Sequence, residues 1–330
     1  MTPRISFCIV NTNARELVLE CLGSIFEHPP ATEFEVIVLD NASADGSASA
    51  IRERYGERVQ LIERERRISK AANDSELIGQ SSGEYSLLLN ADSRLTAGAA
   101  DALLSELESR PRAAAAGAQL VDGKGSSSPS AWRFPGLGTA LAGIFFLHRR
   151  FTVQSSGAQT KEVDWVQSAG MLVRRSAFEQ VGPLDPRFFV YSEEVDWQRR
   201  AKDLGWSILY VPAARIVHEE QLSSDPSAVR RIVEFSRNRD LYVTKHHGPA
   251  VALAVRVLTS ATYLLRAVAA LVLPRHSARR YLRHAYHSLF PGAGDGLREA
   301  AEAYNRTLDE RDGGGRGSEI AHRLPDVQDR

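Results

Sequence analysis

Cysteine is scarce in this chain, and its charges cancel. Only Cys8 and Cys21 occur among 330 residues, in no C-x-x-C spacing; both lie where a strand and a helix would bury them, which fits a reducing cytoplasm. Lysine plus arginine and aspartate plus glutamate each number 41, so the net charge of zero argues against a nucleic-acid-binding surface. With 43% hydrophobic residues, the chain has enough apolar side chains for a globular core.

The first residues lack the features of a secretory leader. Met1–Arg4 runs directly into the apolar segment Ile5–Val10, without a charged region, a long apolar core and a cleavage site. We expect the first strand to begin there. Asn11–Glu16, which follows this strand, contains no glycine, although a glycine-rich phosphate loop would be expected at this position in a nucleotidyltransferase.

Short apolar runs separated by helical patterns predict a parallel sheet. The predicted strands are Ile5–Val10, Phe34–Leu39, Val59–Ile62 and Tyr85–Leu89. Ligands of such sheets bind beyond the carboxyl ends of the strands. Three polar clusters lie at these ends: Asn11-Thr12-Asn13, Asp40-Asn41-Ala42-Ser43 and Asn90-Ala91-Asp92. In the second cluster, Asp40 is the residue expected to accept hydrogen bonds from a base or a ribose.

The third cluster places a carboxylate where a divalent cation could be held. Asn90 and Asp92 alternate across Ala91 at the end of a buried strand, so their side chains are expected to point the same way. Mg²⁺ and Mn²⁺ prefer oxygen ligands and often share them with a substrate phosphate. Asp92 is the predicted ligand. Taken alone, the pattern is equally typical of an Asx turn or of a cap on the helix after Thr96.

A second half of the chain begins near Asp164, after the Gly/Ser-rich loop at 122–130. Trp165–Arg174 and Trp206–Val211 are predicted strands, and Ser192–Leu204 is a predicted helix that ends at Gly205.

Acidic and aromatic residues crowd the start of that helix. Three carboxylates and four aromatic side chains fall within ten residues: Phe188, Phe189, Tyr191, Glu193, Glu194, Asp196 and Trp197. Like charges this close raise one another's proton affinity, and a partly desolvated carboxylate can act as a general base. A solvated acidic first turn is the structural alternative, and the aromatic neighbours favour a functional site over it.

The stretch Pro249–Leu273 is apolar except for Arg256, Arg266 and a few hydroxyl groups, and its flanks are basic. Two arginines in a membrane-spanning helix would cost roughly 2.5–3.5 kcal/mol each, which argues against a simple crossing. At about 100° per residue they lie roughly 80° apart, on one side of a helix. Two interpretations remain: an amphipathic helix in the membrane plane, or a helix packed on the rest of the protein. The tail from Arg311 is predicted to be disordered.

Taken in order, the motifs resemble glycosyltransferase family 2, in its bacterial rhamnosyltransferase-like branch. The matching segments span about residues 5–245: FCIVNTN, EVIVLDNASADGS, GEYSLLLNADS, VDWVQSAGMLVRRSAFEQVGPLDPRFFVYSEEVDWQRRAKDLGW and ILYVPAARIVHEE. So many motifs in the family's order make a chance match improbable.

The resemblance implies an α/β protein with the GT-A fold, in which helices flank a mostly parallel central sheet and a C-terminal helical extension follows. It also implies a nucleotide-sugar donor, a divalent cation (Mg²⁺ or Mn²⁺) and inverting sugar transfer. The base position falls on Glu194, and the metal positions fall on Asp92 and His218. The donor-binding positions are Asn11, Thr12, Asn13, Asp40, Asn41, Asn73, Asn90, Ala91 and Asp92. The acceptor-binding positions are Trp165, Ala169, Gly170, Glu193, Asp196 and Trp197.

The chain departs from the family pattern at several positions. Thr12 stands where an aromatic residue is frequent, Glu194 stands where Asp is usual, and residues 67–74 and 167–170 differ in composition or spacing. Similarity favours dTDP-rhamnose as donor and a glycan or polyprenyl-diphosphate-linked acceptor in cell-envelope polysaccharide synthesis. The departures keep a second interpretation open, a weakly active or inactive relative that binds a sugar nucleotide or glycan. A nucleotidyltransferase is the less favoured third.

These patterns predict three regions. A GT-A domain is expected over residues 1–245, an amphipathic helical region with peripheral contact to the inner face of the plasma membrane over 246–290, and a polar tail with a disordered end over 291–330. No nucleic-acid partner is expected, and the oligomeric state is left open.

Overall fold

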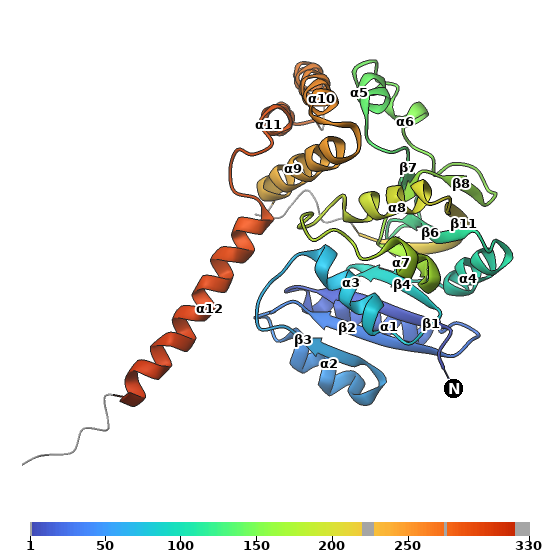
Figure 1. The fold of residues 1–330 in the computed structure, drawn as a ribbon, viewed down its shortest axis with the longest axis vertical. Helices are drawn as coiled ribbons and strands as arrows, with labels where there is room; N and C mark the ends of the chain where they lie inside the picture. The colour runs from blue at the N-terminus through green and yellow to red at the C-terminus, as the bar shows by residue number, and fades with distance from the viewer. Residues whose placement is uncertain (1, 220–227, 274–275, 321–330) are drawn as a thin grey trace, which may run out of the picture.

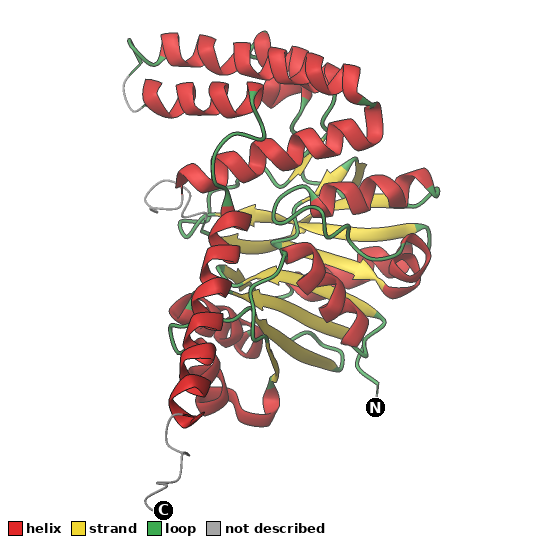
Figure 2. Ribbon diagram, turned by 60° about the vertical axis from the view of Figure 1, so that its left-hand side comes forward, coloured by secondary structure: helices red, strands yellow, loops and turns green. Residues whose placement is uncertain are grey.

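The N-terminal half of the protein is a parallel sheet with helices on both faces (Figures 1 and 2). The computed structural model describes residues 2–219, 228–273 and 276–320, with side chains in the last helix as far as residue 310. The parallel strands, in spatial order, are β3 (Gln60–Glu63), β2 (Phe34–Asp40), β1 (Ile5–Asn11) and β4 (Tyr85–Asn90). Their connecting helices are α1 (Arg15–Glu27), α2 (Ser47–Tyr55) and α3 (Lys70–Gln80). The four predicted strands are confirmed, although β3 is shifted by one residue.

The central strands are apolar on both faces, which explains their unbroken hydrophobic runs. Phe7 and Ile9 of β1 face one core, whereas Cys8 packs with Ile37 and Leu88 in the other. Both cysteines are buried and unpaired, as predicted. Three of the strands extend one residue beyond their apolar run, and a polar residue therefore ends each of them.

The second half of the sheet mixes strand directions. β10 (Gly170–Arg174) runs antiparallel between β4 and β6 (Ala113–Val121), and β11 (Ser207–His218) runs parallel to β6. The short strands β5 (Ser93–Leu95) and β8 (Lys161–Val163) pair antiparallel with β11. The helices of this half are α4 (Ala99–Ser109), α7 (Arg175–Val181) and α8 (Glu193–Asp203). The helix predicted at 192–204 is confirmed as α8.

Two strand predictions in this half need correction. The strand predicted at 165–174 is broken, because β9 (Trp165–Val166) pairs with β7 (Ala131–Trp132) in a separate small sheet before the chain enters β10. The strand predicted at 206–211 continues to His218 as β11. Its register shifts between Val211 and Arg215, around Pro212, which cannot donate a ladder hydrogen bond.

A layer of helices covers one end of the sheet, at the top of Figure 1. It contains α5 (Leu137–Ile144), α6 (His148–Phe151), α9 (Ala228–His247), α10 (Pro249–Ala269) and α11 (Ala278–Leu289). α10 packs against α5, α9 and α11, and Arg256 forms a bidentate ion pair with Asp240 of α9 at 2.6 and 2.7 Å. Within the described residues, α10 is the one helix that is long and apolar enough to cross a membrane by length and composition.

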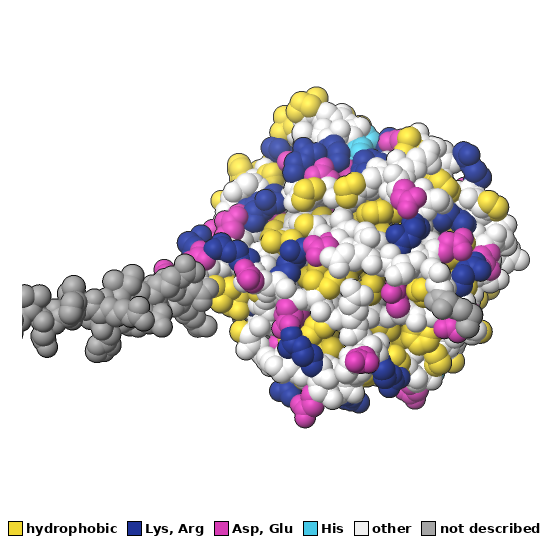
Figure 3. All heavy atoms as spheres, turned by 60° about the horizontal axis from the view of Figure 1, so that its bottom comes forward, with side chains coloured by type: hydrophobic (Ala, Val, Ile, Leu, Met, Phe, Trp, Pro, Cys, Tyr) yellow, Lys and Arg dark blue, Asp and Glu magenta, His cyan; other side chains and the backbone are white. Residues whose placement is uncertain are grey.

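The last helix extends away from the body of the molecule (Figure 1). α12 (Leu297–Ile320) contacts the loop before α3, where Asn305 exchanges two hydrogen bonds with the backbone of Arg67 at 2.8 and 2.9 Å. The sequence predicted disorder from Arg311, whereas the structure continues the helix to Ile320. Residues 321–330 of that predicted tail lie outside the described residues. On the described part of the face in Figure 3, acidic and basic side chains are interspersed.

Candidate active site

Asn11 and Asp40 meet at the carboxyl edge of the sheet because β1 and β2 pair in register at these two residues. Asn11 Nδ2 donates to Asp40 Oδ2 at 2.8 Å, and Asp40 Oδ1 accepts from the backbone N–H of Ser43 at 2.8 Å. Both side chains are buried. The carboxylate therefore fixes the turn after β2, while the buried Asn11 Oδ1 has no partner among the described residues.

The other predicted donor-binding residues of this edge join the same network. Asn41 donates to Thr12 Oγ1 at 3.4 Å and to the carbonyl of Ile68 at 3.2 Å, and it accepts from the Ile68 N–H at 3.0 Å. Asn13 adopts φ 48° and accepts from the Ala44 N–H at 2.8 Å. The structure thus assembles three chain segments into one polar rim.

Asn73 lies apart from that rim, inside α3. It is completely buried, and its Oδ1 accepts from Arg64 Nε at 2.8 Å. Its Nδ2 has no partner among the described residues.

Asp92 and His218 form the predicted metal pair. His218 ends β11 opposite Ser93 of β5, so Asp92, which precedes β5, comes to lie beside it. Asp92 Oδ1 is 3.2 Å from His218 Nε2, and Asn90 Nδ2 is 3.3 Å from the same nitrogen. The alternative of a helix cap is wrong, because α4 begins after Gly98 without any side-chain cap.

The atoms at this position fit a divalent cation that shares its ligands with a phosphate. A carboxylate oxygen and an imidazole nitrogen converge there, and the buried Asn90 Oδ1 has no hydrogen-bond partner among the described residues. No cluster of three or more His, Cys, Asp or Glu side chains occurs in the described part of the chain. A cation at Asp92 and His218 would therefore need oxygen ligands from substrate or water.

Glu193 and Glu194 begin α8 after a strained turn. Tyr191 and Ser192 both have positive φ, 73° and 69°, which costs free energy for side chains other than glycine. Both glutamates are buried, and Oε2 of each has no hydrogen-bond partner among the described residues. Burial raises the pKa of both carboxyl groups, and the neighbouring Glu194 raises the pKa of Glu193 further. A carboxyl group with a raised pKa binds a proton more readily, which suits a general base.

The two glutamates face different surroundings. Glu193 Oε1 lies 4.0 Å from Lys70 Nζ, and that ammonium group is 2.5 Å from Asp74 of α3. Glu194 instead lines a cavity of about 510 Å³ beside Trp165. Their divergence agrees with the 100° step between successive helix residues.

Two tryptophans form a wall of that cavity. The rings of Trp132 and Trp165 stack with centroids 4.5 Å apart and planes inclined by 23°. Trp165 Nε1 donates to the carbonyl of Arg133 at 3.1 Å, which fixes the orientation of the indole. Stacked aromatic faces beside a carboxyl group are well suited to contact the apolar face of a sugar ring.

The structure does not support two of the predicted acceptor contacts. Trp197 is 1% exposed, donates to the carbonyl of Gly182 at 3.0 Å and stacks on Phe178, so it belongs to the core. Asp196 is fully buried in an ion cluster with Arg200 at 2.9 Å and Lys245 at 2.7 Å. These two side chains hold α8 to its neighbours.

Ala169 and Gly170 are also enclosed. The carbonyl of Ala169 accepts from Ser93 Oγ at 2.9 Å. A Cβ atom on Gly170 would come within 2.8 Å of Ile216 Cδ1. Packing therefore constrains both residues, Ala169 through its backbone carbonyl and Gly170 through its lack of a side chain.

Sequence reasoning missed three parts of the site. It gave no role to Lys70, although the Ser69 cap and the i, i+4 spacing to Asp74 mark a charged first turn of α3. It missed Trp132. It also missed the wall that α9, α10 and α11 contribute to the cavity of Glu194, for which no local sequence signal exists.

The sheet topology is that of the GT-A fold. The site combines a polar rim at the sheet edge, a carboxylate–histidine pair and a buried carboxyl group beside a cavity. Together these features define the class of nucleotide-sugar glycosyltransferases. Residues 3–234 match the family described as "Glycosyltransferase like family 2". The chain belongs to this family.

Named relatives agree with this assignment. The chain is 31% identical over 239 residues to an N-acetylglucosaminyl-diphospho-decaprenol L-rhamnosyltransferase of Mycobacterium tuberculosis, which covers 66% of this chain and 78% of that protein. It is 27% identical over 212 residues to glycosyltransferase AglE of Haloferax volcanii, across 63% of this chain and 64% of that protein.

Solved structures share the fold at low identity. A mannosyltransferase of Pyrobaculum calidifontis, in complex with GDP-Man and Mn²⁺, superposes with a TM-score of 0.59 and 16% identity over 89% of both chains. GalNAc-T7 with UDP, GalNAc and Mn²⁺ superposes with a TM-score of 0.54 and 14% identity, over 92% of this chain and 57% of that one.

Proposed function

We propose that this glycosyltransferase is a metal-dependent inverting enzyme that transfers rhamnose from dTDP-rhamnose to a polyprenyl-diphosphate-linked sugar in cell-envelope polysaccharide synthesis. The environment of Glu194 carries the proposal. This carboxyl group is buried, its pKa is raised, and its Oε2 has no hydrogen-bond partner among the described residues. It lies in the wall of a cavity that is large enough for a sugar. Such a group can act as a general base toward an acceptor hydroxyl.

In the proposed reaction, Glu194 takes the proton of the acceptor hydroxyl. The acceptor oxygen forms a bond to the anomeric carbon from the face opposite the leaving group, and the bond from that carbon to the nucleoside diphosphate breaks. The diphosphate leaves with the bonding electrons, so the anomeric configuration inverts. Asp92 and His218 would hold the divalent cation, which supplies positive charge against the departing diphosphate.

The choice of substrates rests on similarity and on the cavity. The relative from Mycobacterium tuberculosis carries L-rhamnosyltransferase and N-acetylglucosaminyl-diphospho-decaprenol in its name. A lipid-linked acceptor also suits the helical layer, whose outer surface is rich in exposed apolar side chains: Phe145, Phe146, Leu147, Leu264, Leu265, Val268, Leu271 and Val272. We therefore place the enzyme peripherally on the inner face of the plasma membrane.

A donor panel tests this function. Purified enzyme is incubated with dTDP-rhamnose, GDP-mannose or UDP-N-acetylglucosamine, with Mn²⁺ or with EDTA, and release of nucleoside diphosphate is measured with and without a prenyl-diphosphate-linked N-acetylglucosamine. We expect Mn²⁺-dependent release from dTDP-rhamnose that the acceptor accelerates. Tight donor binding without turnover in any combination would favour the non-catalytic relative.

A further inference from the structure

We infer that the cavity of Glu194 contains a second subsite, an anion-binding site formed by Arg239, Arg266 and Arg280, that takes the diphosphate group of a lipid-linked acceptor. The acceptor part of this inference rests on the proposed function. The three arginines come from α9, α10 and α11, and all three line the same cavity as Glu194.

The charge of the cavity wall is strongly unbalanced. Five arginines and one acid are found among the described residues that line it: Arg133, Arg231, Arg239, Arg266, Arg280 and Glu194. The protein as a whole has zero net charge, so this excess of positive charge is local to the cavity. Such a wall attracts an anion, and its partial burial strengthens that attraction.

The three subsite arginines have no carboxylate partner among the described residues. Arg239 Nη2 donates to Ser288 Oγ at 3.0 Å, and the guanidinium of Arg266 lies 5.7 Å from the centroid of the Tyr263 ring. Burial lowers the pKa of Arg239. Most of the donor groups of these arginines therefore remain available to a ligand.

His284 lies close to the charges of Arg239, Arg266 and Arg280. It lines the same cavity and stacks on Tyr263 with ring centroids 4.6 Å apart. Burial lowers its pKa to about 4, and the charges of Arg280, Arg239 and Arg266 all act in the same direction. The imidazole is therefore neutral at pH 7, so it can accept a hydrogen bond from an arginine or donate one to a phosphate oxygen.

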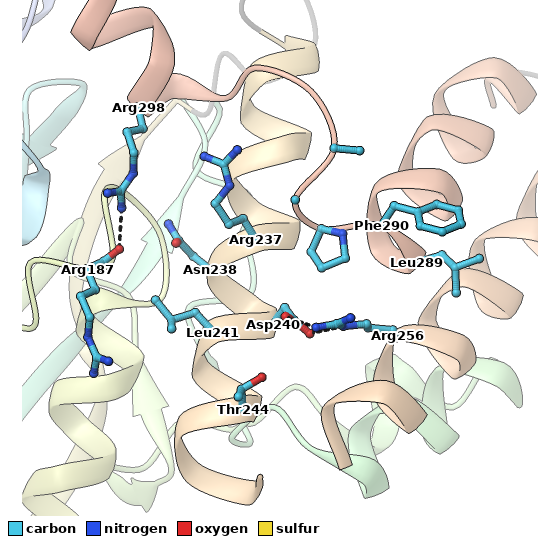
Figure 4. Close-up of a pocket in the computed structure, with 13 residues that line it drawn as sticks. Arg187, Arg237, Asn238, Asp240, Leu241, Thr244, Arg256, Leu289, Phe290 and Arg298 are labelled. Carbon is cyan, nitrogen blue, oxygen red and sulfur yellow. Dashed lines mark hydrogen bonds and ion pairs between the residues drawn. The ribbon is translucent and has the colours of Figure 1, made fainter. Parts of the chain in front are cut away.

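A neighbouring cavity shows the contrasting case of paired arginines. The pocket in Figure 4 is larger, about 910 Å³, and four arginines line it: Arg187, Arg237, Arg256 and Arg298. Three of them form ion pairs, whereas Arg298 Nη2 donates to the carbonyl of Arg187 at 2.6 Å. Arg256 pairs with Asp240, Arg237 with Glu299 at 2.9 Å, and Arg187 with Asp185 at 2.6 Å. The pairs of Arg256 and Arg237 join α9 to α10 and to α12, and the pair of Arg187 lies within the loop before α8. Within the described residues, Arg239, Arg266 and Arg280 at the Glu194 cavity form no ion pair with a carboxylate, which leaves them available to a ligand.

The order of groups around the cavity fits an amphiphile. Glu194 and the stacked tryptophans suit a sugar hydroxyl, and the arginines suit a diphosphate, which guanidinium groups bind through paired hydrogen bonds. On α10, the residues next to Arg266 are exposed and apolar, with Leu264 and Leu265 about half exposed and Val268 66% exposed. The hydrocarbon chain of an acceptor whose diphosphate is bound by the arginines could lie against this surface.

Calorimetric binding of farnesyl diphosphate, in EDTA and without donor, tests the subsite. Removing the cation excludes metal-mediated binding at Asp92. We expect the wild-type protein to bind, and the double variant Arg266→Gln/Arg280→Gln to bind at least ~10-fold more weakly, because two charge-assisted contacts are lost. The matched control, Arg279→Gln/Arg283→Gln, removes the same charge from residues of α11 outside the cavity wall and should bind as the wild type does.

Further measurements distinguish a lipid-diphosphate subsite from a general anion site and from misfolding of the variants. Inorganic pyrophosphate and farnesol should each bind more weakly than farnesyl diphosphate; equal binding of pyrophosphate would overturn the lipid part of the inference. Equal affinity of the wild type and Arg266→Gln/Arg280→Gln, or equal losses in both double variants, would overturn the subsite. Far-UV circular dichroism and thermal unfolding check that each variant is folded. Donor turnover is measured separately, so failure of the proposed function would leave the farnesyl diphosphate result unaffected.

Discussion

Asp92 Oδ1 and His218 Nε2 lie 3.2 Å apart because β5 and β11, which are distant in the sequence, pair antiparallel. We expect Asp92→Asn to lose at least ~100-fold in turnover, because a neutral amide is a poor ligand for a divalent cation that must offset diphosphate charge. Calorimetry of dTDP binding with and without Mn²⁺ should show that Mn²⁺ no longer increases the affinity of the variant for dTDP. Asp203→Asn, at the end of α8, serves as control. An unchanged Mn²⁺ requirement in Asp92→Asn would remove Asp92 from the metal site.

Glu194 and Glu193 are natural controls for each other, because they are adjacent, buried and isosteric with glutamine. Glu194→Gln should lower kcat at least ~100-fold with donor affinity nearly intact, since it removes basicity and keeps size. Glu193→Gln should change kcat much less, because Glu193 faces Lys70 rather than the cavity. If Glu193→Gln abolished turnover while Glu194→Gln left it normal, the two assignments would be exchanged.

The acid limb of the pH profile should depend on Lys70. A base must be deprotonated to act, so kcat/KM should fall as the pH falls through the pKa of Glu194, which burial raises above its usual 4.5 despite the opposing charge of Lys70. Lys70→Met removes that charge, so the acid limb should move to higher pH. Lys124→Met, in an exposed loop, should leave the limb in place. A limb that moved to lower pH in Lys70→Met would contradict this electrostatic account.

Asp196 is expected to act on stability rather than on acceptor binding. Asp196→Asn should reduce the free energy of unfolding at pH 7 by about 3 kcal/mol, because the partly buried Arg200, Lys245 and His246 lose the carboxylate that they share. Burial opposes ionisation of Asp196, but hydrogen bonds from His246 and Lys245 outweigh it and lower its pKa. A carboxyl group of lowered pKa stabilises the fold above its unfolded pKa of about 3.9, and this contribution disappears as the pH falls through the lower folded value.

Urea unfolding of the wild type and of Asp196→Asn, from pH 7 down toward pH 3, tests whether the stabilisation by Asp196 disappears as the pH falls. The difference between the two should be largest at neutral pH and should shrink below about pH 4. Exposed Asp203→Asn is the control for a simple charge change. A raised acceptor KM in Asp196→Asn with unchanged stability would restore the acceptor-binding assignment.

The exposed apolar tip of the helical layer should control membrane association. Leu271, Val272 and Leu273 are 75%, 82% and 50% exposed. Replacing all three by Asn should reduce partitioning onto anionic vesicles in a sedimentation assay, because burial of apolar area drives interfacial binding. Leu204→Asn removes a leucine that is 48% exposed at the end of α8 and should partition as the wild type does. Equal partitioning of all three proteins would favour α10 as a packing helix only.

The sequence by itself determined the four parallel strands of the N-terminal half and the polar residues that end three of them. Unbroken apolar runs mark strands buried on both faces, and polar residues such as Asn11, Asp40 and Asn90 mark their carboxyl ends. Because parallel strands share one edge, the location of the donor side followed from local patterns alone. The order of motifs further indicated the family and the fold.

Only the tertiary structure decided which side chains meet. The positive φ angles of Tyr191 and Ser192 set the first turn of α8, so Glu194 faces the cavity while Trp197 enters the core. Helical period gives the spacing of such residues but not the absolute direction of each side chain. The contact of Lys70 with Glu193 joins segments far apart in the chain, and so does the cavity wall to which α9, α10 and α11 contribute arginines. Long-range packing sets these contacts, and a local sequence pattern carries no record of it.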